Sequence, residues 1–242
     1  MFGEYLTEHG TRDNSICAIT AAMGIGTGLQ KFASSFPKRF FDVGIAEEHA
    51  VTFASGLAKC NMKPVFAVYS TFLQRCYDQI VHDVSLQKLK VVFAIDRAGF
   101  VGDDGETHNG LLDVPFLNTI PDITVYSPCC YRSLKADINS ALYIDERSVA
   151  VRYPRGKENE NVKKLRYDTL EYSYYGSDDS SIALVTYGRI TSHAIDAVDI
   201  LQKSGVNVKL ISFNRIKPLY EKVIEELMNF SKIYFFEEGF KR

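Results

Sequence analysis

Glu47 is the first residue whose position suggests chemistry. It lies in the segment Phe41-Asp-Val-Gly-Ile-Ala-Glu-Glu-His-Ala-Val-Thr-Phe53, just inside an expected helix that follows an expected strand. Ligand sites of open α/β sheets lie at the carboxyl ends of the strands, so this carboxylate is a candidate ligand group. On position alone, the simpler interpretation is that it complements the positive end of the helix dipole. Glu48 and His49 are most simply structural helix residues.

Arginines and a glycine-rich loop follow two further expected strands. Arg97 stands in Asp-Arg-Ala-Gly, and Arg155 stands in Tyr-Pro-Arg-Gly. The planar guanidinium fork suits phosphate better than a lysine does, although most surface arginines are merely solvated. The loop from Gly99 to Gly110 carries Asp104 and His108. A histidine there could relay a proton, although a lone loop histidine is more often plain surface.

Alternating strand and helix patterns surround these residues. Apolar runs predict strands at 39–43, 65–69, 91–95, 123–126 and 149–153. Helical spacing after the first strand is carried by Ala46, Ala50, Ala54, Leu57 and Ala58. We expect Ser70 or Thr71 to cap a further helix, whose shared face consists of Phe72, Cys76, Ile80 and Val84. The alternation predicts a doubly wound, mostly parallel sheet.

The composition changes after Gly156. Residues 157–180 are polar and weakly periodic, which favours an inter-domain linker. A second α/β unit is expected to follow, with strands at 182–187, 206–213 and 232–236 and helices at 192–203 and 220–229. We therefore predict one domain over 1–156 and another over 181–242. The second is expected to be cut short, with the natural protein continuing beyond it.

Charge and cysteine content exclude several classes of protein. The formal net charge is −2, and scattered Lys and Arg residues give no reason to expect nucleic acid or a membrane surface as a partner. No apolar run approaches the ~20 residues of a membrane span, and no secretory signal is visible. The five cysteines show no C-x-x-C spacing, which fits reduced thiols better than disulfides or zinc. A cytoplasmic location is the default.

Several motifs in fixed order resemble one enzyme family. Glu47 and its surroundings look like the glutamate-bearing helix of transketolase-like thiamine-diphosphate enzymes, in the form found in 1-deoxy-D-xylulose-5-phosphate synthases. The resemblance covers nearly the whole chain. It continues through Tyr69-Ser-Thr-Phe-Leu-Gln-Arg75, Tyr77-Asp-Gln79, His82-Asp-Val84, Ala94-Ile-Asp-Arg-Ala-Gly99, Asp104-Gly-Glu-Thr-His108 and Tyr153-Pro-Arg-Gly156. It implies a pyrimidine-binding domain followed by a transketolase C-terminal-like domain.

The resemblance implies roles at the cofactor. In the family, the glutamate matching Glu47 hydrogen-bonds N1′ of the aminopyrimidine, and sharing that proton allows the imino tautomer that acts as the base. Phe72 matches the aromatic residue that stacks on the pyrimidine, although without the resemblance a core role would be the better interpretation. His108 approaches the cofactor adduct as a proton relay.

The resemblance also implies substrates and a pathway. Pyruvate would be decarboxylated and its two-carbon unit transferred to glyceraldehyde 3-phosphate, feeding non-mevalonate isoprenoid (terpenoid) biosynthesis and thiamine biosynthesis. Arg97 and Arg155 match positions that contact the phosphate, Tyr69 and Arg75 line the same region, and Asp104 approaches the aldehyde's hydroxyl groups. A homodimer is implied too, because pyrimidine-binding domains of the family meet across a dimer interface.

The chain departs from the family in what it lacks. The first domain, which carries the Mg²⁺ motif and the diphosphate site, is expected to be missing. The run Gly102-Asp-Asp-Gly105 is assigned to substrate, so no metal ligand is predicted. We expect this chain alone to bind little or no cofactor and to be inactive. Two alternatives remain open: the corresponding half of another thiamine enzyme, such as a pyruvate dehydrogenase β subunit, and a non-catalytic dimerising module.

Overall fold

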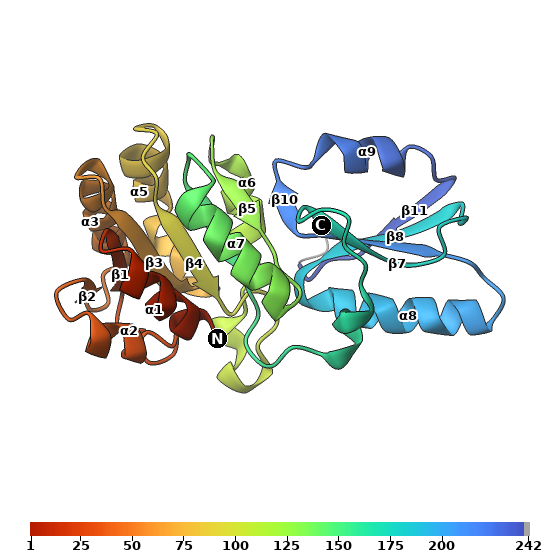
Figure 1. Cartoon of the computed structure of the whole chain (residues 1–242), viewed down its shortest axis with the longest axis horizontal. Helices are drawn as coiled ribbons and strands as arrows, with labels where there is room; N and C mark the ends of the chain where they lie inside the picture. Colours follow the sequence, from red (N-terminus) through yellow and green to blue (C-terminus); the bar gives the residue numbers. More distant parts are fainter. Residues whose placement is uncertain (240–242) are drawn as a thin grey trace.

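The computed structural model describes residues 1–239, which fold into two β-sheets with helices packed against them. Figure 1 shows the sheets next to each other, with the red-to-green part of the chain on the left and the cyan-to-blue part on the right. We refer to residues 1–156 as the N-terminal unit and to 157–239 as the C-terminal unit. The predicted α/β class with two consecutive units is confirmed.

A seven-stranded sheet forms the centre of the N-terminal unit. Its order is β10-β5-β6-β4-β3-β1-β2, and every neighbouring pair is parallel except β10 with β5. β10 comes from the C-terminal unit and ties the two units together. β1 is absent from the predicted strands, whereas the other N-terminal strands match them. The strands are β1 (Ile16–Thr20), β2 (Phe40–Asp42), β3 (Lys63–Tyr69), β4 (Val92–Asp96), β5 (Thr124–Tyr126), β6 (Val149–Arg152) and β10 (Arg215–Lys217).

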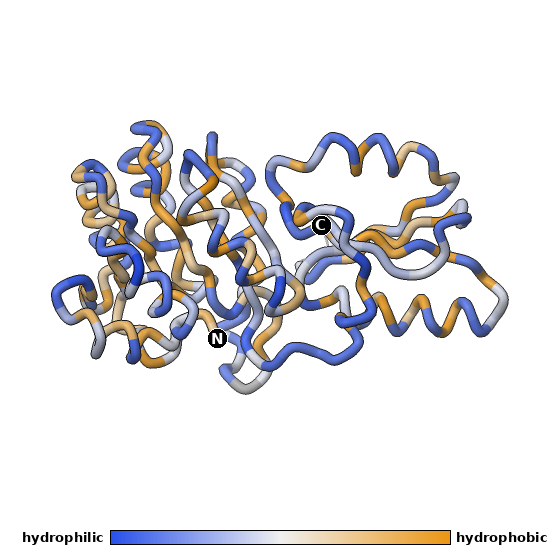
Figure 2. Tube along the Cα trace, viewed as in Figure 1, coloured by the Kyte–Doolittle hydropathy of each residue, from blue (hydrophilic) through white to orange (hydrophobic). Residues whose placement is uncertain are grey.

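Helices cover both faces of this sheet. Phe66 and Phe93 project into one core layer and Val65 and Val92 into the other, as the two-residue period of a strand requires. Figure 2 shows the strands of the sheet as predominantly hydrophobic segments. The first layer is closed by α3 (Glu47–Lys59), α4 (Ser70–Leu73) and α6 (Asp113–Thr119), and the second by α1 (Phe2–Arg12), α2 (Gln30–Ser35) and α7 (Tyr131–Tyr143).

The helix predicted from Ser70 onward is not continuous. It changes turn type repeatedly, through α4, the 3₁₀ segment η1 (Gln74–Cys76), α5 (Tyr77–Gln79) and the π-helical η2 (Ile80–Ser85). The predicted side-chain cap is wrong, because Tyr69 occupies the N-cap position and no side chain caps the helix. The shared face nevertheless packs as expected, with Cys76, Ile80 and Val84 buried. Irregular turns of this kind often accompany functional sites.

The C-terminal unit contains a four-stranded sheet in the order β11-β8-β9-β7. β7 is antiparallel to β9, and the other pairs are parallel. Figure 1 shows helices α8 (Thr191–Lys203) and α9 (Glu221–Leu227) on opposite faces. The strands are β7 (Tyr172–Gly176), β8 (Ile182–Tyr187), β9 (Lys209–Phe213) and β11 (Lys232–Phe235).

The prediction that residues 157–180 form a linker is wrong for much of that range. β7 lies within it and pairs with β9, burying Tyr172 and Tyr174. The 3₁₀ segment η5 (Glu160–Lys164) also lies within it and packs Val162 against α8. Tertiary pairing gives this polar sequence its structure, and no local hydrophobic period announces it.

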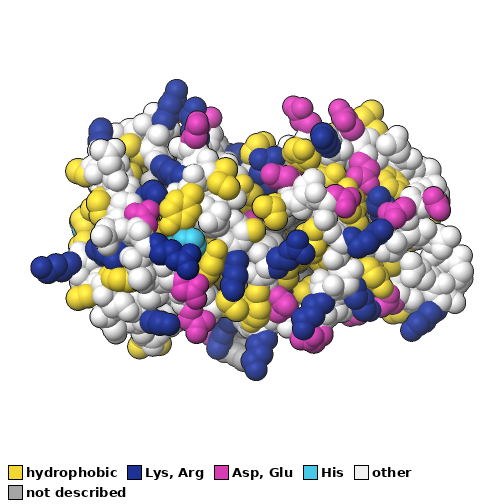
Figure 3. All heavy atoms as spheres, in the orientation of Figure 1, with side chains coloured by type: hydrophobic (Ala, Val, Ile, Leu, Met, Phe, Trp, Pro, Cys, Tyr) yellow, Lys and Arg dark blue, Asp and Glu magenta, His cyan; other side chains and the backbone are white. Residues whose placement is uncertain are grey.

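The surface carries mixed charge. Figure 3 shows Lys and Arg side chains interspersed with Asp and Glu over both units on the face in view, which agrees with the small net charge. Within residues 1–239, none of the helices is both long enough and apolar enough to cross a lipid bilayer.

Candidate active site

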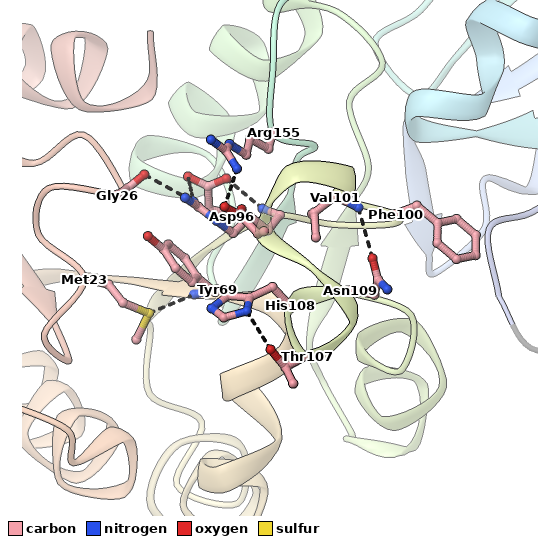
Figure 4. A network of polar contacts seen from close by, with 12 residues as sticks. Met23, Gly26, Tyr69, Asp96, Phe100, Val101, Thr107, His108, Asn109 and Arg155 are labelled. Atoms are coloured by element: carbon pink, nitrogen blue, oxygen red, sulfur yellow. Dashed lines mark hydrogen bonds and ion pairs between the residues drawn. The ribbon is translucent and has the colours of Figure 1, made fainter.

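The predicted site residues gather at the carboxyl ends of parallel strands. Glu47 begins α3 after β2, Tyr69 ends β3, Arg97 follows β4, and Arg155 follows β6. The strands are neighbours or near neighbours in one sheet, so residues far apart in sequence reach the same edge. Figure 4 shows part of this edge, with Tyr69, Asp96 and Arg155 near His108 of the glycine-rich loop.

Glu47 is buried at the start of α3, with only 2% of its surface exposed. Its Oε1 accepts a hydrogen bond from Nη1 of Arg75 at 2.8 Å. The guanidinium carbon of Arg75 lies 4.7 Å from the centre of the Phe72 ring. Within residues 1–239, no hydrogen bond reaches Oε2 of Glu47, so that oxygen remains available to a donor from a bound ring.

Arg75 therefore lies with Glu47 and Phe72, whereas the resemblance assigns it to the region of the aldehyde phosphate. Its side chain is 42% exposed, so part of its charge faces solvent. Both of its contacts connect it to the residues implied at the cofactor. The placement favours a role in orienting Glu47.

Tyr69 and Arg97 form a second cluster at this edge. The Arg97 guanidinium carbon lies 3.6 Å from the centre of the Tyr69 ring, and Arg97 Nη1 donates to the carbonyl of Gly26 at 3.3 Å. A Cβ atom on Gly26 would fall 1.5 Å from the Tyr69 hydroxyl oxygen, so any other residue there would force the Tyr69 ring to move. Arg97 adopts a φ of +63°, a strained conformation typical of functional sites.

Asp104 joins the two predicted phosphate-binding arginines. Its Oδ2 accepts from Arg97 Nε at 2.8 Å, and its Oδ1 pairs with Arg155. Burial raises the pKa of Asp104, but hydrogen bonds and charge from the two arginines outweigh burial and lower it overall. Beneath them, Asp96 Oδ2 lies 3.5 Å from Arg97 Nη1. Burial raises the pKa of Asp96 to about 6, against the opposing charge of Arg97.

His108 lies between the two aromatic side chains. Its ring centre is 5.4 Å from that of Phe72 and 6.2 Å from that of Tyr69. Its Nδ1 makes a 2.9 Å hydrogen bond with the hydroxyl of Thr107, visible in Figure 4. Phe72 and Tyr69 also contact each other, with ring centres 6.1 Å apart, so the three rings form one cluster that joins the Glu47 end of the site to the Arg97 end.

Sequence reasoning missed three residues at this site. Asp96 lies inside a quoted motif but was assigned no role, and Gly26 follows the unpredicted strand β1. The glycine run Gly24-Ile-Gly-Thr-Gly28 after an apolar stretch was the available signal for that loop. Arg189, from the C-terminal unit, donates to the carbonyl of Phe100 at 2.7 Å, and no sequence pattern announces it.

A cavity of about 540 Å³ lies between the two units and reaches the arginine cluster. Arg97 and Arg155 line it from the N-terminal unit, and Arg189 and His193 line it from the C-terminal unit. Across the described part of the chain, no group of three or more His, Cys, Asp or Glu side chains has an arrangement that could hold a metal ion.

Family models match both units. Residues 1–159 match the transketolase pyrimidine-binding domain, and residues 173–242 match the transketolase C-terminal domain. The chain belongs to the transketolase family.

Comparison with individual named proteins gives more detail than the family models do. The chain is 49% identical to the 1-deoxy-D-xylulose-5-phosphate synthase of Clostridium kluyveri over 228 residues, which is 94% of this chain and 36% of that enzyme. It is 46% identical to the synthase of Natranaerobius thermophilus over 243 residues, covering 99% of this chain and 38% of that enzyme. The chain thus spans little more than a third of the length of these relatives.

Solved structures agree on the fold. A transketolase from Campylobacter jejuni superposes with a TM-score of 0.82 at 17% identity, over 98% of this chain and 41% of that one. A structure titled as a split-gene transketolase, an inactive β4 tetramer, superposes with a TM-score of 0.77 at 24% identity, over 98% and 78%.

Proposed function

We propose that this transketolase-family chain forms the pyrimidine-binding and aldehyde-phosphate-binding part of a 1-deoxy-D-xylulose-5-phosphate synthase. That enzyme would use thiamine diphosphate and Mg²⁺ to decarboxylate pyruvate and transfer the two-carbon unit to glyceraldehyde 3-phosphate. The observation that carries the proposal is Glu47, a buried carboxyl group with one oxygen free, at the same sheet edge as two arginines. The 46–49% identity to named synthases supports this choice of reaction.

Thiamine diphosphate, when bound, supplies the carbon nucleophile and electron sink for decarboxylating a 2-oxo acid. Oε2 of Glu47 would share a proton with a ring nitrogen of the aminopyrimidine. Arg75 fixes the other oxygen at 2.8 Å and so sets the direction of the carboxyl group. Phe72 offers an aromatic face at this end of the site.

The arginine cluster would hold the aldehyde's phosphate. Each guanidinium carries five N–H groups and gives one of them to Asp104, while Nη1 of Arg97 also faces the Gly26 carbonyl and Asp96. The remaining donors on Arg97 and Arg155 can bind a dianion, and the hydroxyl of Tyr69 lies beside them. Burial raises the pKa of Tyr69, which keeps the phenol protonated as a donor. Asp104 itself could accept a hydrogen bond from the sugar hydroxyls.

His108 is the proposed proton carrier between the two ends. It contacts the rings of Phe72 and Tyr69, so a reacting group bound over Phe72 would lie beside its imidazole. The hydrogen bond to Thr107 holds one ring nitrogen and leaves the other, Nε2, to face substrate.

Further parts of the proposal concern assembly. We propose a domain boundary between residue 156 and the C-terminal unit, a homodimer, and a cytoplasmic location. The diphosphate and Mg²⁺ would be held by a domain outside this sequence, because relatives are almost three times longer. The chain by itself would then bind thiamine diphosphate weakly and lack turnover. Calorimetry with thiamine diphosphate and Mg²⁺ tests this, and tight metal-dependent binding would count against it.

A chimera tests the reaction directly. This chain would replace the matching region of the Clostridium kluyveri synthase, with which it is 49% identical. We expect the purified chimera to form 1-deoxy-D-xylulose 5-phosphate from pyruvate and glyceraldehyde 3-phosphate. A folded, cofactor-loaded chimera that makes a different product, or none, would overturn the proposal.

A further inference from the structure

Two adjacent cysteines, Cys129 and Cys130, line the cavity between the units. They lie in the loop from β5 to α7, and Cys130 is the N-cap residue of α7. N-caps are normally Ser, Thr, Asp or Asn, whose oxygen accepts the first backbone N–H groups of a helix. Here a sulfur takes that position, and both cysteines are half-buried.

Donors surround the sulfur of Cys130. The backbone N–H of Ser133 points to it at 3.5 Å, and its hydroxyl lies 3.3 Å away. The phenol of Tyr167 lies at 3.2 Å. The Ser133 hydroxyl donates its proton to the Cys130 carbonyl at 3.0 Å, so the donors directed at the sulfur are the Ser133 N–H and the Tyr167 phenol. A sulfur that accepts from several donors at a helix N-terminus is stabilised as a thiolate.

We propose that Cys130 is a nucleophilic thiolate modified by peroxides, with Cys129 as its partner thiol. This site is separate from the Glu47 site and does not depend on the proposed function. The adjacent Cys129 side chain is the largest cause that lowers the pKa of Cys130, and Ser133 and Tyr167 add to it. Burial opposes this effect without reversing it.

Other titratable groups surround the pair. Asp137 on α7 is close enough to Cys130 for their charges to interact. Burial raises the pKa of Asp137 despite its hydrogen bond from Asn214. Glu158 already binds the same helix N-terminus, because its carboxylate accepts from the N–H of Tyr131 at 2.5 Å. Arg132 lies over the Tyr167 ring at 4.5 Å and brings a compensating positive charge.

The proposed chemistry balances in two steps. The Cys130 thiolate attacks one oxygen of hydrogen peroxide, an S–O bond forms, the O–O bond breaks, and hydroxide leaves. The sulfur is oxidised by two electrons to a sulfenic acid as the peroxide is reduced. The Cys129 thiol then attacks that sulfur, an S–S bond forms, and the sulfenic oxygen leaves as water with the thiol proton.

Thiolate character is measured by reactivity at acidic pH. The wild-type chain is treated briefly at about pH 5.5 with iodoacetamide, folded and in urea, and the alkylated residue is located and quantified by mass spectrometry. We expect Cys130 to react about tenfold faster in the folded chain, because an unfolded thiol is ~99.9% protonated there. Cys60, exposed at the end of α3, is the internal control and should react no faster when folded. Slower reaction of Cys130 in the folded chain would overturn the proposal.

Oxidation is tested separately. Peroxide should remove two hydrogen atoms from the wild-type peptide that holds both cysteines. In Cys129→Ser, dimedone should trap a sulfenic acid on Cys130. The Cys130→Ser variant keeps an N-cap oxygen, so it should remain folded, and it should form no disulfide with Cys129. Tyr167→Phe should lower the reactivity of Cys130 severalfold. If Cys60 is oxidised while Cys129 and Cys130 stay reduced, the proposal is wrong.

Discussion

Replacing Arg75 should expose how much the buried carboxyl group of Glu47 depends on one partner. Glu47 is 2% exposed and receives its hydrogen bond from Arg75 at 2.8 Å. Arg75→Ala removes that donor and the contact with Phe72, and it leaves the carboxylate with only the positive end of α3. Glu47→Gln instead removes the charge and keeps an acceptor for the guanidinium.

The magnitude follows from the contacts. A hydrogen bond to a charged group contributes about 1.5–3 kcal/mol, and an exposed cation–π contact contributes about 0.5–1 kcal/mol. Arg75 is 42% exposed, so solvent screens part of its charge and the lower values apply. We therefore expect Arg75→Ala to lower the free energy of unfolding by about 2 kcal/mol and Glu47→Gln by about 1 kcal/mol. The double variant should lose about 1 kcal/mol less free energy of unfolding than the sum of the two single losses.

Urea unfolding of the chain, followed by circular dichroism, measures these differences. Arg147→Ala is the matched control, because Arg147 pairs with Asp122 at 2.7 Å while both side chains are about half exposed. That control should cost at most about 0.5 kcal/mol. Equal effects of Arg75→Ala and Arg147→Ala, or strict additivity in the double variant, would refute the coupling between Arg75 and Glu47.

Three further predictions test other parts of the structure. Gly26→Ala should destabilise the chain by about 1–3 kcal/mol, because the added Cβ meets the Tyr69 hydroxyl. Gly56→Ala, in open space on α3, should instead stabilise the chain by about 0.5–1 kcal/mol. Equal urea midpoints for the two variants would contradict this prediction. Asp137 is buried and accepts from Asn214 at 2.6 Å, and burial raises its pKa despite that bond. The pKa of Asp137 in the folded chain lies above the unfolded value of ~3.9. Its contribution to stability is therefore fully present below pH ~3.9 and is lost as the pH rises through the folded pKa. As pH rises from 4 to 8, the free energy of unfolding of Asp137→Asn should therefore increase relative to that of the wild type in urea titrations. A stability difference between the two chains that does not change with pH would contradict this. In the chimera, Arg155→Ala should raise the KM for glyceraldehyde 3-phosphate more than that for pyruvate, and the reverse order in initial-rate kinetics would remove Arg155 from the phosphate site.

The sequence predicted most of the N-terminal sheet because its strands are nearly continuous apolar runs. β4 is buried at every position, as a central parallel strand should be. β1 is equally buried, but it was not predicted, and a glycine run follows it in the sequence. β7 (Tyr172–Gly176) has no strict alternation and lies inside a charged segment, and β10 is three residues long and pairs with β5 across the unit boundary. Pairing with distant strands creates these elements, so no local pattern reveals them.

The site was predicted through resemblance more than through spacing. Glu47, Phe72, Tyr69 and the arginines lie at one sheet edge, in keeping with the expectation for strand-end residues. The sequence could not say that Arg75 turns toward Glu47, because the two are 28 residues apart and meet only after α3 and α4 pack. Contacts with Gly26 and Arg189 likewise depend on how loops fold over the sheet.

The central claim is that the carboxyl group of Glu47 shares a proton with the cofactor's pyrimidine. The most direct measurement compares Glu47→Gln with Glu48→Gln in the chimera. Both changes replace a carboxyl group by an amide in the first turn of α3, but Glu47 is buried and Glu48 is exposed. We predict that Glu47→Gln forms no detectable 1-deoxy-D-xylulose 5-phosphate while Glu48→Gln retains the parent rate. Full turnover by a folded Glu47→Gln chimera would contradict the account.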